Sequence, residues 1–311
     1  MNHLQPLQVL KKCNICPRNC NANRFSDKLG YCNADASFRI STICNHMGEE
    51  PVISGPKGIC NIFFTNCNLQ CVFCQNYQIS NNKLDHSKCE MELEDIIRQI
   101  TYVLNMGMNI VGFVSPTHFT PHVKVIINAL HERGIKPTIV YNSNGYDRVE
   151  TLRDMEGMVD VYLPDFKYMD PSVSGEYSDA KDYPEVALNA LKEMYRQKGS
   201  TLVVDNQGYA MSGIIIRHLV LPGQVKNSVK VMETIAAEVS NKLHISLMSQ
   251  YHPNHHVYDH PKLGETVRPR DYYKVVDAMD KFGFSRGWVQ EMSSASNYLP
   301  DFRKKHPFER M

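Results

Sequence analysis

The sequence predicts an α/β protein built around a mainly parallel sheet, because two patterns alternate along most of the chain. Short apolar segments typical of buried strands are each followed by a longer segment with the periodicity of an amphipathic helix. Six such units are too few for a closed eight-stranded barrel, so these patterns allow either a partial barrel or an open doubly wound sheet. Both arrangements bind ligands at the carboxyl ends of the strands.

The elements are expected in strict alternation after a cysteine-rich beginning. Buried strands are predicted at residues 59–66, 109–115, 136–142, 159–165, 213–221 and 243–249. Helices are predicted between and after them, at residues 90–106, 121–134, 148–155, 183–199, 225–240 and 271–282. Residues 168–182 interrupt the fourth unit and are expected to be an irregular insertion.

The composition is that of a globular protein with a nearly neutral net charge. Hydrophobic residues make up 42% of the 311 residues and charged residues 22%, which excludes a largely disordered chain. The 34 Lys and Arg nearly balance the 33 Asp and Glu, so a nucleic-acid partner is not expected. No apolar run is long enough for a membrane span, and residues 1–12 lack the apolar core of a secretory signal. We therefore expect a cytoplasmic protein that does not insert into a membrane.

The most informative feature is the set of ten cysteines, since clustered cysteines in a reducing compartment usually bind metal. Cys67, Cys71 and Cys74 form a C-x3-C-x2-C loop directly after the first predicted strand. Three thiolates can bind three irons of a cubane cluster and leave the fourth iron open to substrate. The alternatives are a zinc site completed by a distant residue and three buried thiols without a metal.

A second cysteine group lies near the N-terminus. Cys13, Cys16, Cys20 and Cys32 offer four thiolates within twenty residues, in a segment with too little apolar periodicity to build a core alone. A closed tetrathiolate site would supply folding energy to such a segment. Zinc is favoured, and an auxiliary iron–sulfur cluster that relays electrons is the alternative.

With an aromatic residue, Phe73, just before its last cysteine, the loop resembles the signature of the radical S-adenosylmethionine (SAM) superfamily. The resemblance extends from Cys13 to about Arg286 and is greatest to the pyruvate formate-lyase activating enzyme-like group. Within that group it points to an uncharacterised branch with an extra N-terminal four-cysteine motif. The segments that carry this resemblance are Gly48-Glu49-Glu50-Pro51, Tyr141-Asn142-Ser143-Asn144-Gly145-Tyr146, Tyr162-Leu163-Pro164-Asp165-Phe166-Lys167-Tyr168 and Arg217-His218-Leu219-Val220-Leu221-Pro222-Gly223.

The resemblance implies an oxidoreductase that holds a [4Fe-4S] cluster on Cys67, Cys71 and Cys74. Such a cluster reductively cleaves SAM to a 5′-deoxyadenosyl radical, which abstracts hydrogen from the substrate. The resemblance also implies a partial (β/α)6 TIM-like barrel, with a small N-terminal cysteine-rich metal-binding segment at residues 1–47. The radical SAM barrel would occupy residues 48–290, and residues 291–311 would form a C-terminal tail.

The residues expected to bind SAM follow the predicted strands. By resemblance, Phe73 and Asn76 contact the adenine, and Asn142 and Asn144 follow the third strand. Activating enzymes usually carry Gly-Gly-Glu after the second strand to receive the methionine amino group. This chain departs from that pattern with Ser115-Pro116-Thr117, so the available acceptors are the hydroxyls of Ser115 and Thr117 or backbone carbonyls.

Three charged residues complete the expected cofactor site. Asp165 and Lys167 match an Asp-x-Lys segment placed near the ribose and the methionyl carboxylate, with their mutual pairing as the alternative. Arg217 lies inside an apolar strand, where a charge needs a ligand or a partner. We expect Arg217 to face the cofactor or substrate, and a salt bridge to Asp165 is the alternative.

The function expected from the resemblance is hydrogen abstraction from a protein or peptide substrate, like the activators of glycyl-radical enzymes. Flavodoxin or ferredoxin would donate the electron. One alternative keeps the radical chemistry on a small metabolite. The alternative of a different class is a zinc-ribbon-type binding module without catalysis.

Overall fold

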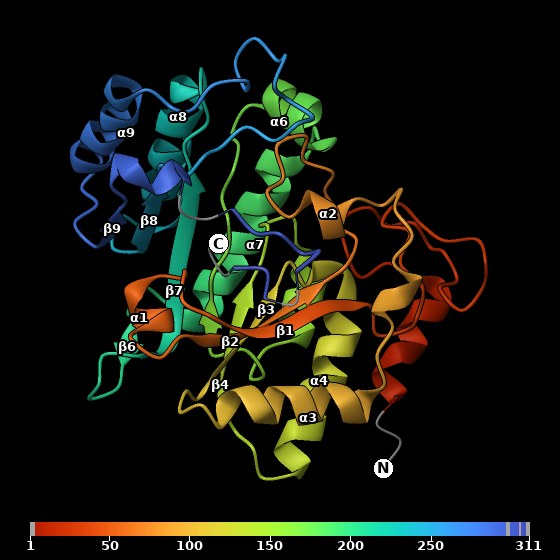
Figure 1. Cartoon of the computed structure of the whole chain (residues 1–311). Coiled ribbons are helices and arrows are strands. Elements are labelled where there is room, and N and C mark those ends of the chain that lie inside the picture. The colour runs from red at the N-terminus through yellow and green to blue at the C-terminus, as the bar shows by residue number, and fades with distance from the viewer. Residues whose placement is uncertain (1–3, 297–298, 305, 309–311) are drawn as a thin grey trace.

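The structure, a computed structural model, describes residues 4–296, 299–304 and 306–308 (Figure 1). Parts of the expected C-terminal tail, at residues 297–298, 305 and 309–311, lie outside the described residues. One curved sheet runs through the molecule in the order β1-β2-β3-β4-β5-β7-β8-β9, and β6 pairs with β7 alongside it.

The six predicted strands are all present and pair in parallel with their sequence neighbours. They are β2 (Ile59–Phe64), β3 (Ile110–Val114), β4 (Thr138–Asn142), β5 (Val161–Tyr162), β7 (Ala210–Leu219) and β8 (His244–Met248). Strand order follows chain order without the reversal of a doubly wound sheet, so the partial barrel is confirmed. The described residues show no pairing that would close the sheet between β1 and β9.

Three further strands were not predicted from the sequence. β1 (Ile40–His46) runs antiparallel to β2, and β9 (Gly287–Val289) extends the sheet beyond β8. β6 (Val203–Val204) forms a short hairpin with β7. The expected cysteine-rich segment therefore contributes an edge strand to the sheet.

The helices predicted between the strands are confirmed, with ends displaced by a few residues. They are α3 (Leu93–Leu104), α4 (Thr120–Glu132), α5 (Val149–Asp154), α7 (Tyr183–Lys198), α8 (Val225–Ile235) and α9 (Pro269–Lys281). Short elements complete the set: η1 (Gln5–Lys12), α1 (Pro51–Ser54), α2 (Tyr77–Ser80), η2 (Ser87–Cys89), η3 (Thr117–Phe119), η4 (Ala236–Ser240) and η5 (Met292–Ser296).

The prediction of an irregular insertion at residues 168–182 was wrong. This segment contains a helix, α6 (Pro171–Ser178), which has proline at its first position. The side chain of Asp170 caps the helix by accepting a hydrogen bond from the Ser172 N–H, and Asp179 ends it in the left-handed conformation (φ 52°). An Asp-Pro pair before a short helix was the available signal.

The interior of the barrel changes character along the strands. At the amino ends, one layer of apolar side chains fills the barrel: Ile53, Ile59, Ile110, Val140, Val161, Leu163, Ala210 and Ile215. Two residues further along three of the strands, side chains on the same face are Asn61, Asn142 and Arg217. The interior of the barrel is thus filled by apolar side chains at the amino ends of the strands and lined by polar ones toward the carboxyl ends.

Candidate functional site

A cavity of about 190 Å³ lies at the carboxyl ends of the parallel strands. Its lining includes all but one of the residues expected at the catalytic and cofactor site: Cys67, Cys71, Phe73, Cys74, Asn76, Ser115, Asn142, Asn144, Asp165, Lys167 and Arg217. They come from five separate segments, each near the carboxyl end of a strand. The fold therefore brings together residues up to 150 positions apart at the edge where α/β proteins bind ligands.

The three cysteines of the C-x3-C-x2-C loop all line this cavity, between β2 and α2. The sulfur of Cys67 accepts hydrogen bonds from the Leu69 N–H and the Asn144 amide, both at 3.4 Å. The hydroxyl of Ser178 donates to Cys71 Sγ at 2.9 Å. Donors aimed at sulfur favour the thiolate, which is the form that binds metal.

Burial opposes that ionisation while no cation is bound. Burial raises the pKa of Cys67 to about 12 and that of Cys71 to about 11. The neighbouring Lys167 charge and the Ser178 hydroxyl lower the pKa of Cys71, but less than burial raises it. A bound metal would replace these protons, so the donor set suits an iron–sulfur cluster that supplies its own positive charge.

Lys167 and Asp165 form an ion pair in the cavity wall just beyond β5. Burial alone would lower the pKa of Lys167, but the Asp165 carboxylate and the Cys71 thiol hold it above its usual value. Lys167 is therefore a cation beside the cysteine loop. The pairing weighed as the alternative is present, and both residues also line the cavity.

Arg217 projects from β7 and is shared by three carboxylates. Its Nη1 lies 2.8 Å from Glu49 Oε2, and its Nε lies 3.8 Å from Glu50 Oε1 and 3.6 Å from Asp165 Oδ1. The Nε is buried without a hydrogen-bond partner. The expected alternative partner, Asp165, is present but more distant than Glu49.

Glu49 and Glu50 belong to the cavity region and not to the surface. Glu49 lines the cavity, and its Oε1 accepts hydrogen bonds from the side-chain amides of Asn61 (2.8 Å) and Asn142 (3.3 Å). Burial, with the nearby Glu49 carboxylate, raises the pKa of Glu50 above its usual range despite Arg217. Glu49 is therefore the nearer of the two acidic side chains that this segment places against Arg217.

The turn after β4 aims Asn144 at the cysteine loop. Its side-chain amide donates to Asn68 Oδ1 at 2.8 Å as well as to Cys67 Sγ. The turn requires Gly145, which has φ +78°, because a Cβ there would lie 2.1 Å from the Asp165 backbone oxygen. Asn144 is thus a positioning group for Cys67.

Two expected residues after β3 are placed differently. Ser115 lines the cavity and adopts φ 49°. Thr117 is fully buried away from it, and its hydroxyl donates to Asp147 Oδ1 at 2.7 Å. The hydroxyl of Thr117 is therefore used within the core and does not line the cavity.

Sequence reasoning missed several cavity residues. His46 on β1, Phe63 on β2, and Pro300 and Phe308 near the C-terminus all line the cavity. The ring of Phe308 lies 4.2 Å from the His46 ring and 5.3 Å from the Phe63 ring, centroid to centroid. Only the inward alternation of β2 could have indicated Phe63. The others depend on an unpredicted strand and on the return of the C-terminal segment.

The four N-terminal cysteines surround a separate cavity of about 10 Å³, together with Ile15, Arg18, Ala22, Arg24, Gly30 and His118. Within residues 4–296, 299–304 and 306–308, no three His, Cys, Asp or Glu side chains are already placed to hold one metal ion. The same finding covers Cys67, Cys71 and Cys74, whose expected ligand is a cluster. Thiolates on different irons of a cubane are further apart than the ligands of one ion.

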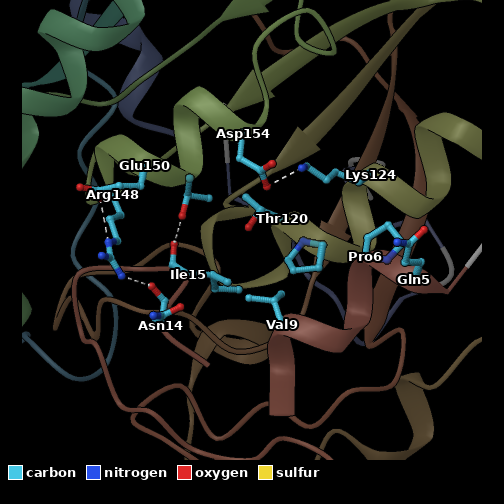
Figure 2. A pocket seen from close by; sticks show the side chains of 12 residues that line it. Gln5, Pro6, Val9, Asn14, Ile15, Thr120, Lys124, Arg148, Glu150 and Asp154 are labelled. Atoms are coloured by element: carbon cyan, nitrogen blue, oxygen red, sulfur yellow. Dashed lines mark hydrogen bonds and ion pairs between the residues drawn. The ribbon is translucent and has the colours of Figure 1, made fainter. Parts of the chain in front are cut away.

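A surface cleft of about 520 Å³ lies elsewhere, between η1, α4 and α5. Figure 2 shows that Arg148 reaches both Glu150 and Asn14, and that Lys124 pairs with Asp154 across the cleft. Arg148 donates to the Asn14 backbone oxygen at 2.7 Å, and Thr151 donates to that of Ile15 at 2.7 Å. No cysteine lines the cleft. The two hydrogen bonds attach the turn between Cys13 and Cys16 to the beginning of α5.

The histidines after β8 make no metal site in the described part of the chain. The rings of His255 and His256 pack on Tyr77, and His260 packs on Tyr177. No helix in that part of the chain is long and apolar enough to cross a membrane.

Comparison with known proteins identifies the family of this chain. The model of the radical SAM superfamily matches residues 61–233. An uncharacterized protein of Methanocaldococcus jannaschii is 28% identical over 279 residues, which cover 88% of this chain and 76% of that protein.

Solved structures show weaker similarity. A domain of a pyruvate-formate lyase-activating enzyme from Bacteroides vulgatus matches with 17% identity and a TM-score of 0.38, over 55% of this chain and 93% of that one. Streptococcus suis SuiB bound to its precursor peptide SuiA matches with 13% identity and a TM-score of 0.48, over 76% of this chain. The match covers half of the SuiB chain. The family model matches more than half of this chain, which therefore belongs to the radical SAM superfamily.

Proposed function

We propose that this chain is a radical SAM enzyme that abstracts hydrogen from a protein or peptide substrate, in the manner of glycyl-radical-enzyme activators. Members of the superfamily bind a [4Fe-4S] cluster and SAM. When bound, the reduced cluster supplies the electron that cleaves SAM, and the products provide the oxidant for hydrogen abstraction. The side chains of this chain would hold these groups and position the substrate.

One observation carries the proposal: three cysteines and the expected polar residues of four further segments line the same cavity. No other cysteine in the described residues lines it. Cys67, Cys71 and Cys74 would hold three irons, which leaves one iron without a protein thiolate. The donor set therefore fits a cluster with one position open to a ligand.

The charged residues would position SAM. Lys167, a buried cation beside Cys71, suits the methionyl carboxylate, and the unpartnered Nε of Arg217 is a second donor. Asp165, which already accepts from Lys167, suits a ribose hydroxyl or the amino group. Phe73, Asn76, Ser115, Asn142 and Asn144 would complete the cofactor contacts.

The open sheet supports a polypeptide as the substrate. The parallel strands run from β2 to β9 without closing, within the part of the chain that the structure describes. His46, Phe63 and Phe308 also line the cavity, and His46 and Phe308 lie outside the parallel strands. An extended chain could thus reach the cavity from the side, which a closed barrel would prevent.

We also propose the finer organisation expected from the sequence. Residues 48–290 would form the radical SAM unit, and residues 291–311 a tail that reaches the cavity at Pro300 and Phe308. Residues 1–47 would be the cysteine-rich segment of the four-cysteine branch, with a second metal at Cys13, Cys16, Cys20 and Cys32. A flavodoxin or ferredoxin would donate electrons, consistent with a cytoplasmic enzyme.

A substrate experiment tests this assignment. The anaerobically reconstituted, reduced protein is mixed with SAM and a glycyl-radical-type enzyme from the same genome, and the enzyme is examined by electron paramagnetic resonance. We expect an organic radical on the added polypeptide and faster formation of 5′-deoxyadenosine than without it. Stimulation of SAM cleavage by small metabolites alone would instead favour metabolite modification.

A further inference from the structure

The cavity at the N-terminal cysteines is small, about 10 Å³ against about 190 Å³ for the cavity at the Cys67–Cys74 loop. All four cysteines of the segment line it, so a metal held by them would have no position open to a substrate. Four cysteines around one position are the ligand set of a structural zinc site.

Backbone N–H groups already point at these sulfurs. The Tyr31 N–H donates to Cys20 Sγ at 3.3 Å. The N–H groups of Arg18 and Ala34 donate to Cys16 and Cys32, in each case two residues after the cysteine. Such bonds stabilise the thiolate form of these three cysteines.

The charge around the cavity fits a tetrathiolate site. Four thiolates on a divalent ion carry a net charge of −2, and two arginines, Arg18 and Arg24, line the same cavity. Arg24 is almost fully buried, with its Nη1 bonded to the His118 backbone oxygen. The Nη2 of Arg18 is buried without a hydrogen-bond partner. The positive charge of both guanidinium groups would offset the negative charge of such a site.

Gly30 leaves the space that Cys20 needs. A Cβ at residue 30 would lie 2.8 Å from the Cβ of Cys20 and 2.9 Å from its sulfur. Real Cβ atoms do not approach other atoms so closely, so Cys20 can face the cavity only because residue 30 is glycine.

The cysteine segment is bonded directly to the cluster loop through Arg18. Its Nε donates to the backbone oxygen of Asn68 at 2.8 Å. The guanidinium stacks on the ring of Tyr31, with its central carbon 3.7 Å from the ring centroid. This contact fixes Arg18 against the residue that precedes Cys32. Arg18 lies two residues after Cys16, and Asn68 directly follows Cys67.

A second connection runs through Asn82. Its side-chain amide donates to the backbone oxygens of Tyr31 (3.0 Å) and Cys67 (2.9 Å). Its Oδ1 accepts from the Cys67 N–H at 2.9 Å. The residue before Cys32 is thus joined to both backbone groups of Cys67.

We propose that Cys13, Cys16, Cys20 and Cys32 hold a single tetrahedral metal ion of the zinc class, and that this site fixes the backbone of residues 67–69 through Arg18 and Asn82. Because no three of the described side chains already surround one metal position, the thiol groups rotate toward the cavity when the ion binds. Only the second half of this inference rests on the proposed function, since it treats Cys67 as a cluster ligand.

Metal analysis tests the first half. The variant with Cys67, Cys71 and Cys74 all replaced by Ser is prepared anaerobically with both zinc and iron supplied, and its metals are measured by mass spectrometry. We expect about one zinc per chain and no iron. Adding Cys16→Ser should remove the zinc, whereas adding Cys89→Ser, at a half-buried thiol outside both sites, should not.

Cluster-level iron in the triple variant, or zinc below about a tenth of an ion per chain, would overturn the single-ion site. A failure of the proposed function would look different, because the unmodified chain would then bind no cluster while the triple variant kept its zinc.

Hydrogen exchange of the fully reconstituted protein tests the second half. In Arg18→Ala, zinc should be retained, and the amides of residues 67–69 should exchange about fivefold to tenfold faster, the effect of losing one hydrogen bond. Arg133→Ala, at an exposed arginine directly after α4, should leave these amides unchanged. Unchanged exchange at residues 67–69 in zinc-loaded Arg18→Ala would refute the link.

Discussion

The guanidinium of Arg217 lies 2.8 Å from the carboxylate of Glu49, which joins β7 to the segment that leads into the barrel. Both side chains are largely buried, at 16% and 6% exposure. A buried charge is stable only while its partner is present. This contact therefore fixes the position of Arg217 at the edge of the cavity.

Glu49→Gln should destabilise the fold by about 3 kcal/mol, because it removes the carboxylate nearest to the largely buried guanidinium of Arg217. Glu238→Gln is the matched control, because the pair of Glu238 with Lys192 is half exposed and its loss should cost less than about 0.5 kcal/mol. Denaturant unfolding under anaerobic conditions measures both. Equal stability of the two variants would contradict a structural role for the pair.

Lys167→Met should weaken SAM binding by about tenfold or more, because it removes a charged hydrogen-bond donor from the cavity. Lys192→Met removes an exposed lysine and should bind SAM like the unmodified chain. Calorimetry on reconstituted protein gives the affinity, and iron content measured in parallel shows whether the cluster is retained. Unchanged affinity with full iron content would exclude Lys167 as a SAM ligand.

Gly145→Ala should disrupt the turn that aims Asn144 at Cys67. Its Cβ would lie 2.1 Å from the Asp165 backbone oxygen, whereas a Cβ at Gly134, with a similar φ of +75°, would meet nothing within 4 Å. Gly134→Ala should cost about 1 kcal/mol from the positive φ alone. Gly145→Ala should cost more and reduce iron binding, so an iron content and stability equal to those of Gly134→Ala would show that the close approach is relieved elsewhere.

Buried histidines should make the fold less stable in mild acid. Burial lowers the pKa of His218 from its ordinary value near 6.5 to about 4, although its Nδ1 is bonded to the Phe166 backbone oxygen. Since the unfolded chain binds the proton first, the contribution of His218 is complete above about pH 6.5. It falls by up to about 1.4 kcal/mol per pH unit as the pH drops toward 4.

His218→Asn should flatten the loss of stability between pH 6.5 and pH 5 relative to the unmodified chain. His131→Asn, at an exposed position on α4, should not change that slope. Denaturant unfolding at a series of pH values measures both. A slope that is the same in all three proteins would mean that the folded and unfolded chains bind a proton at His218 equally well.

Much of this architecture follows from sequence patterns. The apolar strands and the amphipathic α3 are specified by local periodicity, α4 by the proline and glycine at its ends, and the C-x3-C-x2-C loop by spacing. β1 was missed because its burial does not alternate: it is an edge strand whose pairing depends on β2. The two-residue β5 was recognised only because the predicted segment was longer than the strand.

The candidate site was predictable in part, for a related reason. Residues directly after strands meet at one edge of a parallel sheet, so Cys67, Asn142 and Asp165 could be grouped from order alone. Thr117 could not be separated from Ser115, because the turn that buries Thr117 against Asp147 is a tertiary feature. The contact of Phe308 with His46 joins residues 262 positions apart, and no local pattern indicates it.

The central claim is that Cys67, Cys71 and Cys74 hold a cluster that cleaves SAM. The most direct test measures 5′-deoxyadenosine formed from SAM by the anaerobically reconstituted, reduced chain and by its Cys71→Ser and Cys89→Ser variants. We predict product from the unmodified chain and from Cys89→Ser, and none above background from Cys71→Ser. Undiminished cleavage in Cys71→Ser, or no cleavage by an unmodified chain that holds four irons, would contradict the account.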